Sequence, residues 1–314
     1  MTTLKRDNGR SVIPTTFDNP DRAVSRYLVA DGYRTHCLEA GSPKAPPLVL
    51  VHGHSMEIGM GVDRWYPTVL PLAERFHVFA VDEIGHGGSD APRDRALLGH
   101  IRVRAEHVIS FIESLGVGAV HLVGQSQGGW IVAYIAITRP DLVNKMVLVD
   151  SASASASDQT RDGLPYFKEV FEPNTMIPKH DLKTKEGIRS YLGVFLYDRS
   201  AMIEAYVERL LKLSFKWNDL YMPLVRKAWS EDGLKTYTEQ YTIDGAQVRD
   251  LVSRIRAHTL FIWGKQSCKP LEPGIELYRK VEDAEMHVFD KAGHFVWLDQ
   301  AKPFNDLVTY FLTR

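Results

Sequence analysis

The stretch AVHLVGQSQGG, residues 119–129, decides the fold. A largely apolar run, typical of a buried strand, leads into a serine flanked by glycines in the pattern G-x-S-x-G. Gly124 and Gly128 lack Cβ atoms, so a strand and a helix can pack closely around a strained turn. We expect this turn to hold Ser126 with its hydroxyl exposed, as a nucleophile requires. The alternative interpretation is an ordinary Gly/Ser turn of an α/β protein.

Apolar runs and helical patterns alternate on both sides of this turn. Two strands joined at Asp31-Gly32 are expected after a polar arm at residues 1–24. Further strands are predicted at 47–53, 144–150, 258–264 and 284–290, and in HVFAVDEIGHGGSD, residues 77–90, where a strand runs into a Gly-rich loop. Helices are predicted at 64–76, 96–115, 274–281 and 302–313. This alternation predicts an α/β fold with a mainly parallel sheet flanked by helices.

Residues 158–248 interrupt the alternation, because they have helical segments and no buried strand. We expect a helical cap at 155–248, inserted between a first core part at 1–154 and a second at 249–314, over the carboxyl ends of the strands. The cap is rich in aromatic side chains, most of them packing and a few lining a crevice for a small hydrophobic or aromatic substrate. They include Tyr166, Phe167, Phe171, Tyr191, Phe195, Tyr197, Tyr206, Phe215, Trp217, Tyr221 and Trp229.

Composition excludes several classes of protein. The 314 residues are 44% hydrophobic and 25% charged, with a formal net charge of −1, so no bulk field recruits nucleic acid or an anionic membrane. Two cysteines make neither a disulfide framework nor a metal site by their spacing. The N-terminus lacks the apolar region of a signal peptide, and no apolar run is long enough to span a membrane. We expect a cytoplasmic protein without cofactor or metal, and a homo-oligomer is left open.

Two backbone amides are candidates for binding the oxyanion of a reacting carbonyl. The segment VHGHS, residues 51–55, follows a predicted strand, and the amide of His54 would point at the developing charge. The amide of Gln127, at the start of the helix after Ser126, would be the second donor. The side chains of His52 and His54 are interpreted as structural, since a neutral imidazole offers one donor and one acceptor to nearby backbone.

His294 is the candidate general base. It lies in DKAGHFVWLDQ, residues 290–300, in a short loop between the last predicted strand and a helix. A base that takes a proton from serine has to be neutral near pH 7, which histidine is. The other loop histidines, such as His86, are interpreted as structural turn residues.

These motifs carry a resemblance. VHGHS, DEIGHGGSD, GQSQGGW and AGHFVW together resemble the α/β-hydrolase superfamily, in which serine precedes histidine along the chain. TKEGIRSYLGVFLYDRS, residues 184–200, and the C-terminal segment from residue 284 are similar to the meta-cleavage-product hydrolases, which cleave C–C bonds in aromatic catabolism. The resemblance implies a hydrolase with a cap and a serine–histidine–acid triad.

The sequence departs from that narrower family at four positions. Ser267 stands where an aspartate is expected, Phe295 where a tryptophan follows the histidine, and Gln125 where an asparagine precedes the serine. The family also uses a cap arginine to hold the substrate carboxylate, and Arg209 is the nearest candidate. The acid that should support His294 is therefore missing from its usual place.

Three carboxylates compete for the role of acid: Asp150, Glu272 and Asp290. We favour Asp150, because it ends the strand after the helix that follows Ser126, and parallel neighbouring strands open on one crevice. A triad is defined by geometry and role, so its acid can follow a different strand. The competing interpretation of Asp150 is an aspartate that only binds loop amides, and Glu272 is the second candidate for the acid.

Three functions remain open at this point. The first is a serine hydrolase that cleaves an ester, a lactone or a C–C bond next to a ketone. The second is a cofactor-independent oxygenase or lyase, in which His294 deprotonates the substrate and Ser126 only assists. The third is a non-catalytic ligand-binding protein on the same fold.

Overall fold

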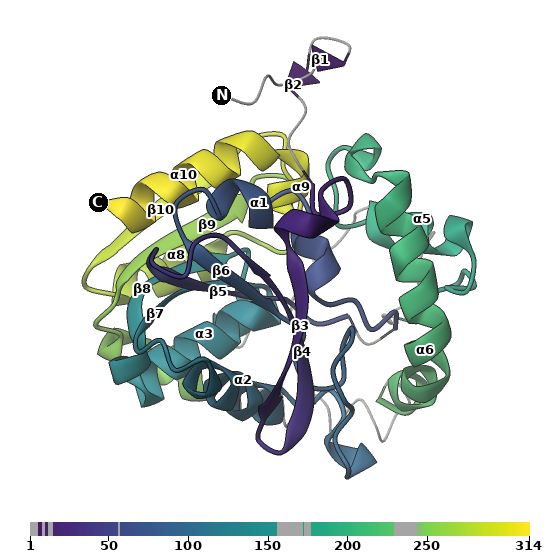
Figure 1. Ribbon diagram of the computed structural model, residues 1–314, viewed down its shortest axis with the longest axis horizontal. Coiled ribbons are helices and arrows are strands. Elements are labelled where there is room, and N and C mark those ends of the chain that lie inside the picture. Colours follow the sequence, from purple (N-terminus) through teal and green to yellow (C-terminus); the bar gives the residue numbers. More distant parts are fainter. Residues whose placement is uncertain are drawn as a thin grey trace.

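An eight-stranded sheet forms the centre of the molecule in the computed structural model (Figure 1). The structure describes residues 6–7, 10–11, 15–55, 57–155, 172, 177–228, 244 and 246–314. The strands lie in the order β10-β9-β8-β7-β5-β6-β4-β3. Their bounds are β3 Val24–Ala30, β4 Tyr33–Ala40, β5 Pro47–Val51, β6 His77–Val81, β7 Val120–Gln125, β8 Val143–Val149, β9 His258–Gly264 and β10 Ala284–Phe289. Strands β5 to β10 are parallel, while β4 pairs antiparallel with β3 and β6.

Alternating side chains of the sheet supply two apolar cores. Leu48 and Leu50 of β5 belong to one cluster, which includes side chains of α1 (Val69–Leu72) and α10 (Ala301–Thr313). Val49 and Val51 belong to the other, which includes side chains of α2 (Ile101–Leu115), α3 (Gln127–Thr138) and α8 (Glu272–Lys280). Because successive side chains of a strand point to opposite faces of the sheet, these two groups of helices cover opposite faces. The predicted α/β class is confirmed.

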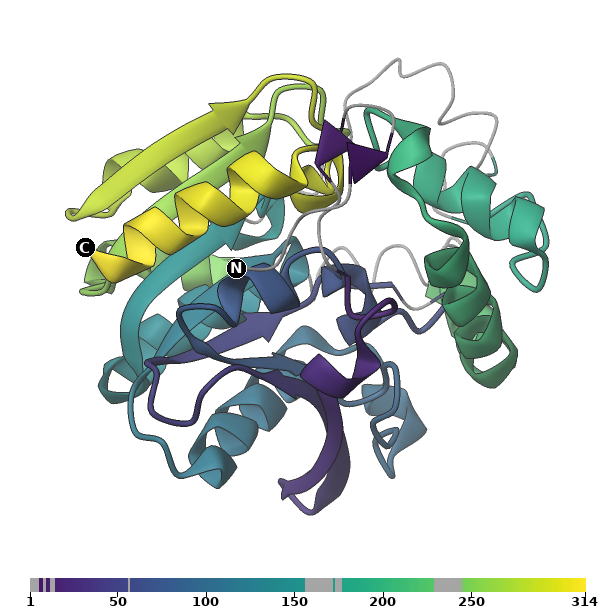
Figure 2. The same ribbon diagram turned by 45° about the horizontal axis from the view of Figure 1, so that its top comes forward.

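The cap helices α5 (Lys185–Gly193) and α6 (Glu204–Ala228) stand beside the sheet layers (Figures 1 and 2). Tyr191 donates to Glu57 at 2.9 Å, Arg209 to Asp63 at 2.9 Å and the Trp217 indole to the Gly87 carbonyl at 3.0 Å. These partners lie in the loops after β5 and β6, so α5 and α6 face the carboxyl ends of the parallel strands. The cap boundaries at 155 and 248 remain a prediction.

The aromatic residues predicted in the cap divide into three groups. Tyr191, Phe195, Tyr206, Trp217 and Tyr221 are buried, as expected for packing side chains. Tyr197 and Phe215 are instead 50% and 60% exposed, and so do not pack in the interior. Tyr166, Phe167, Phe171 and Trp229 lie outside the described residues.

The helix predicted over 64–76 is wrong. The chain forms a short 3-10 helix, Val62–Trp65, and then α1, only four residues long. Pro67 and Pro71 have no N–H to donate, so a long helix cannot be completed here. The helix predicted from 96 begins at Ile101, and its stop at Gly116 is confirmed by a left-handed cap with φ 65°. Other short elements include the antiparallel pair of β1 (Arg6–Asp7) with β2 (Arg10–Ser11) and the helix α9 (Val296–Asp299).

Within the described residues, no helix is both long and apolar enough to cross a membrane.

Candidate active site

Ser126 sits in the strained turn that the sequence predicts. It follows β7 directly, precedes α3, and has φ 54° and ψ −123°. A Cβ on Gly124 would lie 2.3 Å from the Gly128 carbonyl oxygen, and one on Gly128 would lie 2.4 Å from the Val51 carbonyl oxygen. Only glycine fits at either position. A non-glycine residue at positive φ costs about 1–3 kcal/mol, which the surrounding packing has to sustain.

Asp150 lies against His294. The last residue of β8 is Val149, and Asp150 follows it with φ 47° and no solvent exposure. Its Oδ1 is 2.7 Å from His294 Nδ1 and accepts the Ser267 hydroxyl at 2.8 Å, while its Oδ2 accepts the Gly264 amide at 3.1 Å. The aspartate therefore binds the histidine and a loop amide at once, and Ser267 is its neighbour.

The two competing carboxylates lie elsewhere. Glu272 is the first residue of α8, and Asp290 is bound at the surface by the Gln266 side chain at 3.0 Å and by Lys265 at 3.3 Å. In the described part of the chain, no hydrogen bond or ion pair joins either of them to His294. β8 and β9 are adjacent, so Asp150, which directly follows β8, lies beside the start of the loop that follows β9.

Gln125, and not Ser126, contacts the second nitrogen of His294. A carboxylate only accepts, so His294 carries its proton on Nδ1 and its Nε2 accepts the Gln125 side-chain amide at 2.9 Å. The Gln125 carbonyl oxygen in turn accepts Arg64 Nη1 at 2.8 Å. Among the described residues, no hydrogen bond joins the Ser126 hydroxyl to His294. The expected serine–histidine contact therefore requires the Gln125 amide to move.

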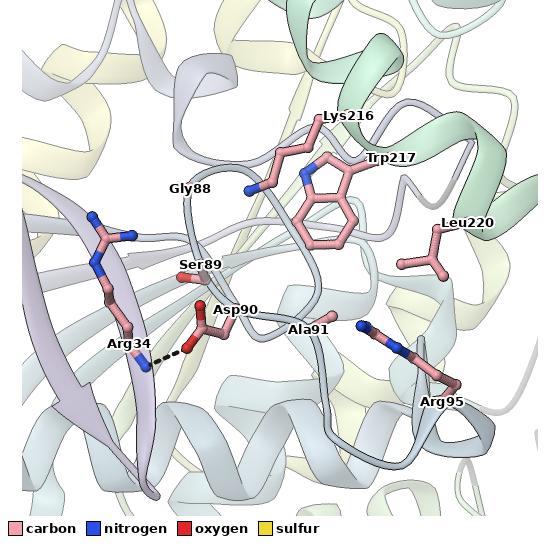
Figure 3. A pocket seen from close by; sticks show the side chains of 9 residues that line it. All are labelled: Arg34, Gly88, Ser89, Asp90, Ala91, Arg95, Lys216, Trp217 and Leu220. Carbon is pink, nitrogen blue, oxygen red and sulfur yellow. Dashed lines mark hydrogen bonds between the residues drawn. The ribbon is translucent and has the colours of Figure 1, made fainter.

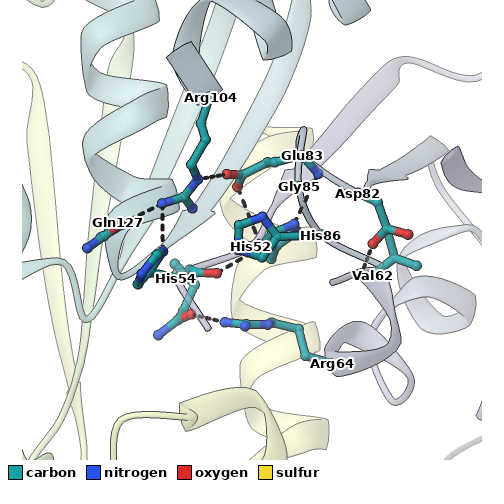
Figure 4. Close-up of polar contacts among 12 residues, drawn as sticks. His52, His54, Val62, Arg64, Asp82, Glu83, Gly85, His86, Arg104 and Gln127 are labelled. Atoms are coloured by element: carbon teal, nitrogen blue, oxygen red, sulfur yellow. Dashed lines mark hydrogen bonds and ion pairs between the residues drawn. The ribbon is translucent and has the colours of Figure 1, made fainter. Parts of the chain in front are cut away.

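In the part of the chain that the structure describes, the amides proposed for an oxyanion hole have no acceptor. No hydrogen bond of the described residues uses the backbone N–H of His54 or of Gln127, which is the first residue of α3. Their side chains meet at Arg104, whose Nη1 donates to Gln127 Oε1 at 2.5 Å and to His54 Nδ1 at 3.2 Å (Figure 4). The two loops that carry the candidate donors are thus connected.

His52, Glu83 and His86 form a buried cluster with the spacing of a metal site, which separation in sequence concealed. However, His52 Nδ1 donates to the Gly53 carbonyl at 2.8 Å, and its Nε2 accepts the Glu83 amide at 3.1 Å. Neither nitrogen is left for a metal, so His52 fits its predicted structural role. Burial lowers the pKa of His52, and lowers the pKa of His54 and His86 well below the usual value.

Arg64 is the site residue that sequence reasoning missed. It is fully buried, and within the described residues its Nε and Nη2 have no hydrogen-bond partner. Burial lowers its pKa to about 10, and its guanidinium lies 5.7 Å from the centre of the Phe295 ring. A charged pair, Asp63 and Arg64, within the mainly apolar segment MGVDRWYP was the available signal. Arg209, the expected carboxylate-binding arginine, is instead paired with Asp63 at 2.9 Å.

A separate pocket of about 280 Å³ lies between α6 and the loop after β6 (Figure 3). Arg34, Arg95 and Lys216 give it a cationic lining, and Asp90 offsets part of that charge. Lys216 already donates to the Gly87 carbonyl at 2.8 Å. Ser126, Asp150 and His294 are not among its lining residues, so this pocket is not part of the candidate active site.

Comparison with known proteins gives consistent results. A family model described as alpha/beta hydrolase fold matches residues 46–301. The chain is 27% identical to a 2-hydroxy-6-oxononadienedioate/2-hydroxy-6-oxononatrienedioate hydrolase of Burkholderia vietnamiensis, over 95% of this chain and 99% of the relative. It is 28% identical to a 2-hydroxy-6-oxo-2,4-heptadienoate hydrolase of Pseudomonas putida, over 94% and 98%.

Solved structures share the fold. The meta-cleavage product hydrolase CumD of Pseudomonas fluorescens IP01 superposes with a TM-score of 0.72 at 22% identity, covering 91% of this chain and 97% of that chain. A putative lipase of Acinetobacter baumannii gives a TM-score of 0.75 at 24% identity, covering 95% and 93%.

Proposed function

Because the chain belongs to the α/β-hydrolase fold family, we propose that it is a serine hydrolase acting through Ser126, His294 and Asp150. The observation that carries this proposal is the buried hydrogen bond of 2.7 Å between Asp150 and His294, beside a serine held in a strained turn. A charged, buried partner fixes the histidine tautomer and stabilises the imidazolium that forms when the serine loses its proton.

The reaction would follow from these positions. Once the Gln125 amide leaves His294 Nε2, that nitrogen can take the Ser126 proton while the serine oxygen attacks a carbonyl carbon. The amides of His54 and Gln127 would hold the resulting oxyanion. His294 then gives the proton to the leaving group, and a water hydrolyses the acyl-serine by the same route. Overall, one water is added across the bond that is cleaved.

We further propose a ring-cleavage product as substrate, an acyclic dienoic acid with a ketone next to the bond that breaks. Two relatives, from Burkholderia vietnamiensis and Pseudomonas putida, are hydrolases of 2-hydroxy-6-oxo acids of this kind. Arg64 supports an anionic substrate, because a buried guanidinium with two unused donor nitrogens lies one residue away from His294, through Gln125. A carboxylate would satisfy both nitrogens and offset the buried charge.

A fluorophosphonate probe tests the nucleophile. We expect mass spectrometry to find the label on Ser126 in the wild type, with labelling lost in Ser126→Ala and strongly slowed in Asp150→Asn. Incubation with 2-hydroxy-6-oxo-6-phenylhexa-2,4-dienoate, followed by the loss of its absorbance and by product analysis, tests the substrate. An unlabelled wild type would refute the serine mechanism, and intact dienoate with a labelled serine would refute only the substrate class.

One observation favours a second candidate, a cofactor-independent oxygenase or lyase. Among the described residues, no hydrogen bond joins Ser126 to His294. Once the Gln125 amide leaves Nε2, the histidine can therefore act on a substrate proton without a nucleophile. Oxygen consumption with the same dienoate distinguishes the two functions. Uptake of oxygen that survives in Ser126→Ala would favour the oxygenase, whereas a reaction that needs Ser126 and no oxygen would favour the hydrolase.

A further inference from the structure

We propose that Arg104 is a positioning residue for the oxyanion hole, and that it aligns both amide donors through their own side chains. This inference rests on the proposed function, because it assigns the amides of His54 and Gln127 to a tetrahedral intermediate. It concerns a residue in the first turn of α2, outside the Ser126, His294 and Asp150 loops.

A single guanidinium reaches both donor residues. Arg104 is fully buried, and its Nη1 donates to Gln127 Oε1 at 2.5 Å and to His54 Nδ1 at 3.2 Å. His54 belongs to the loop after β5, and Gln127 begins α3 after β7. Since an arginine only donates, His54 accepts through Nδ1 and carries its proton on Nε2. The imidazole is kept neutral mainly by burial and secondly by Arg104, which together hold its pKa well below the usual value.

The contact matters because the donors have to converge. An oxyanion hole works when its N–H groups lie about 2.7–3.1 Å from the position of the oxyanion, and an error of about 0.5 Å already weakens it. His54 lies in a loop without regular structure, and its contact with Arg104 is the one hydrogen bond that the described residues give its side chain. Gln127 has the strained Ser126 turn before it. Tying the two side chains to one rigid group fixes the distance between their amides.

Glu83 fixes the orientation of the Arg104 side chain. Its Oε2 accepts Arg104 Nε, and both side chains are buried. The carboxylate offsets the charge of the guanidinium and also fixes its plane, since Nε and Nη1 then have set directions. The expected contribution is therefore orientation of the donors, with little direct attraction between the guanidinium and the oxyanion.

The test is the rate at which a fluorophosphonate labels Ser126, separated into its saturation constant KI and its maximal rate kinact. We expect kinact to fall on the order of 100-fold in Arg104→Met, the loss typical of one missing oxyanion donor, with KI nearly unchanged. Phenylboronic acid, which forms a tetrahedral adduct with serine, should bind weaker by a similar factor. Arg104→Lys should recover only part of the rate, because an ammonium lacks the planar fork.

Two controls separate positioning from folding. Arg102→Met changes an exposed arginine on the same helix and should leave kinact unaltered. The double variant His54→Ala/Gln127→Ala keeps both backbone amides and removes both side-chain acceptors. It should have the same kinact as Arg104→Met. Adding Arg104→Met to the double variant should cause no further loss. If Arg104→Met does not fold, the double variant tests the proposal in its place.

The outcomes are distinct. A labelled wild type with equally fast labelling in Arg104→Met, or in the double variant, would overturn the role of Arg104 and leave the hydrolase intact. Boronate affinity that stays constant while thermal stability falls would mean that Arg104 is only structural. A wild type that is not labelled would instead overturn the proposed function.

Discussion

Replacing Asp150 with asparagine should remove nearly all activity by giving His294 the wrong tautomer. Asp150 Oδ2 accepts the Gly264 amide at 3.1 Å, whereas Oδ1 faces His294 Nδ1 at 2.7 Å and the Ser267 hydroxyl at 2.8 Å. An asparagine has to keep its oxygen toward Gly264, because its NH₂ group there would oppose another donor. The NH₂ group then points at His294, where it donates to Nδ1, and the proton of the imidazole moves to Nε2.

The magnitude follows from that tautomer. A histidine protonated on Nε2 cannot accept the serine proton, and this change in a serine triad typically lowers kcat about 10⁴-fold, or roughly 5 kcal/mol of barrier. The Ser267 hydroxyl can rotate and accept from the new NH₂ group, but the Nε2–H of His294 would then face the Gln125 amide donor, so the fold should lose some stability. Fluorophosphonate labelling of Ser126 and dienoate turnover at pH 7 measure the effect, with circular dichroism as the check on folding.

Ser267→Ala is the matched control. It removes one donor from the same carboxylate but leaves His294 bound, so we expect a loss of about tenfold, the value of a hydrogen bond to a charged group. The reasoning is refuted if Ser267→Ala abolishes activity while Asp150→Asn retains it. In that case the serine at 267, and not the aspartate after β8, would support the histidine.

Three further predictions concern single side chains. Arg64→Met should raise KM for an anionic dienoate on the order of 100-fold, from two lost charged hydrogen bonds. KM for p-nitrophenyl acetate, which carries no carboxylate, should change far less, and equal effects on both would refute a carboxylate site. Gln125→Met removes the amide that donates to His294 Nε2. Fluorophosphonate labelling should become about fivefold faster, which corresponds to the free energy of one neutral hydrogen bond. Slower labelling would contradict the blocking role of Gln125. Burial lowers the pKa of His107 to about 4 from 6.5, so the unfolded chain binds this proton first, and His107 alone should lower the free energy of unfolding by up to about 3 kcal/mol as pH drops from 6.5 to 4. Urea denaturation at both ends of that range checks this, and His107→Gln should make the dependence less steep.

Local patterns predicted the parts of the molecule that local chemistry dictates. The G-x-S-x-G turn was predictable because two close backbone approaches, at Gly124 and Gly128, exclude every other residue. Topology brings Asp150 and His294 to the same edge of the sheet, since they follow β8 and β10, which are both parallel to β9 between them. Neither inference needed a side-chain conformation.

The side-chain network around the serine was not predictable in the same way. Arg64, Gln125 and Arg104 come from separate segments, and their contacts depend on rotamers that only the packed interior sets. The sequence did not indicate that Arg209 pairs with Asp63, which lies in the 3-10 helix Val62–Trp65, far away along the chain. The prediction of a helix at 64–76 was wrong for a local reason. It gave more weight to the apolar spacing than to two prolines, which interrupt the hydrogen bonds of the helix backbone.

The three proposed catalytic residues are distributed unevenly along the chain. Ser126 and Asp150 follow two adjacent strands joined by α3, and the cap enters the sequence only after both of them. An exchange of the cap with that of another hydrolase would therefore leave nucleophile and acid on one uninterrupted segment, with only the histidine to be brought back into register. The molecule is in this sense modular, because a new cap would leave Ser126 and Asp150, the proposed nucleophile and acid, on one segment.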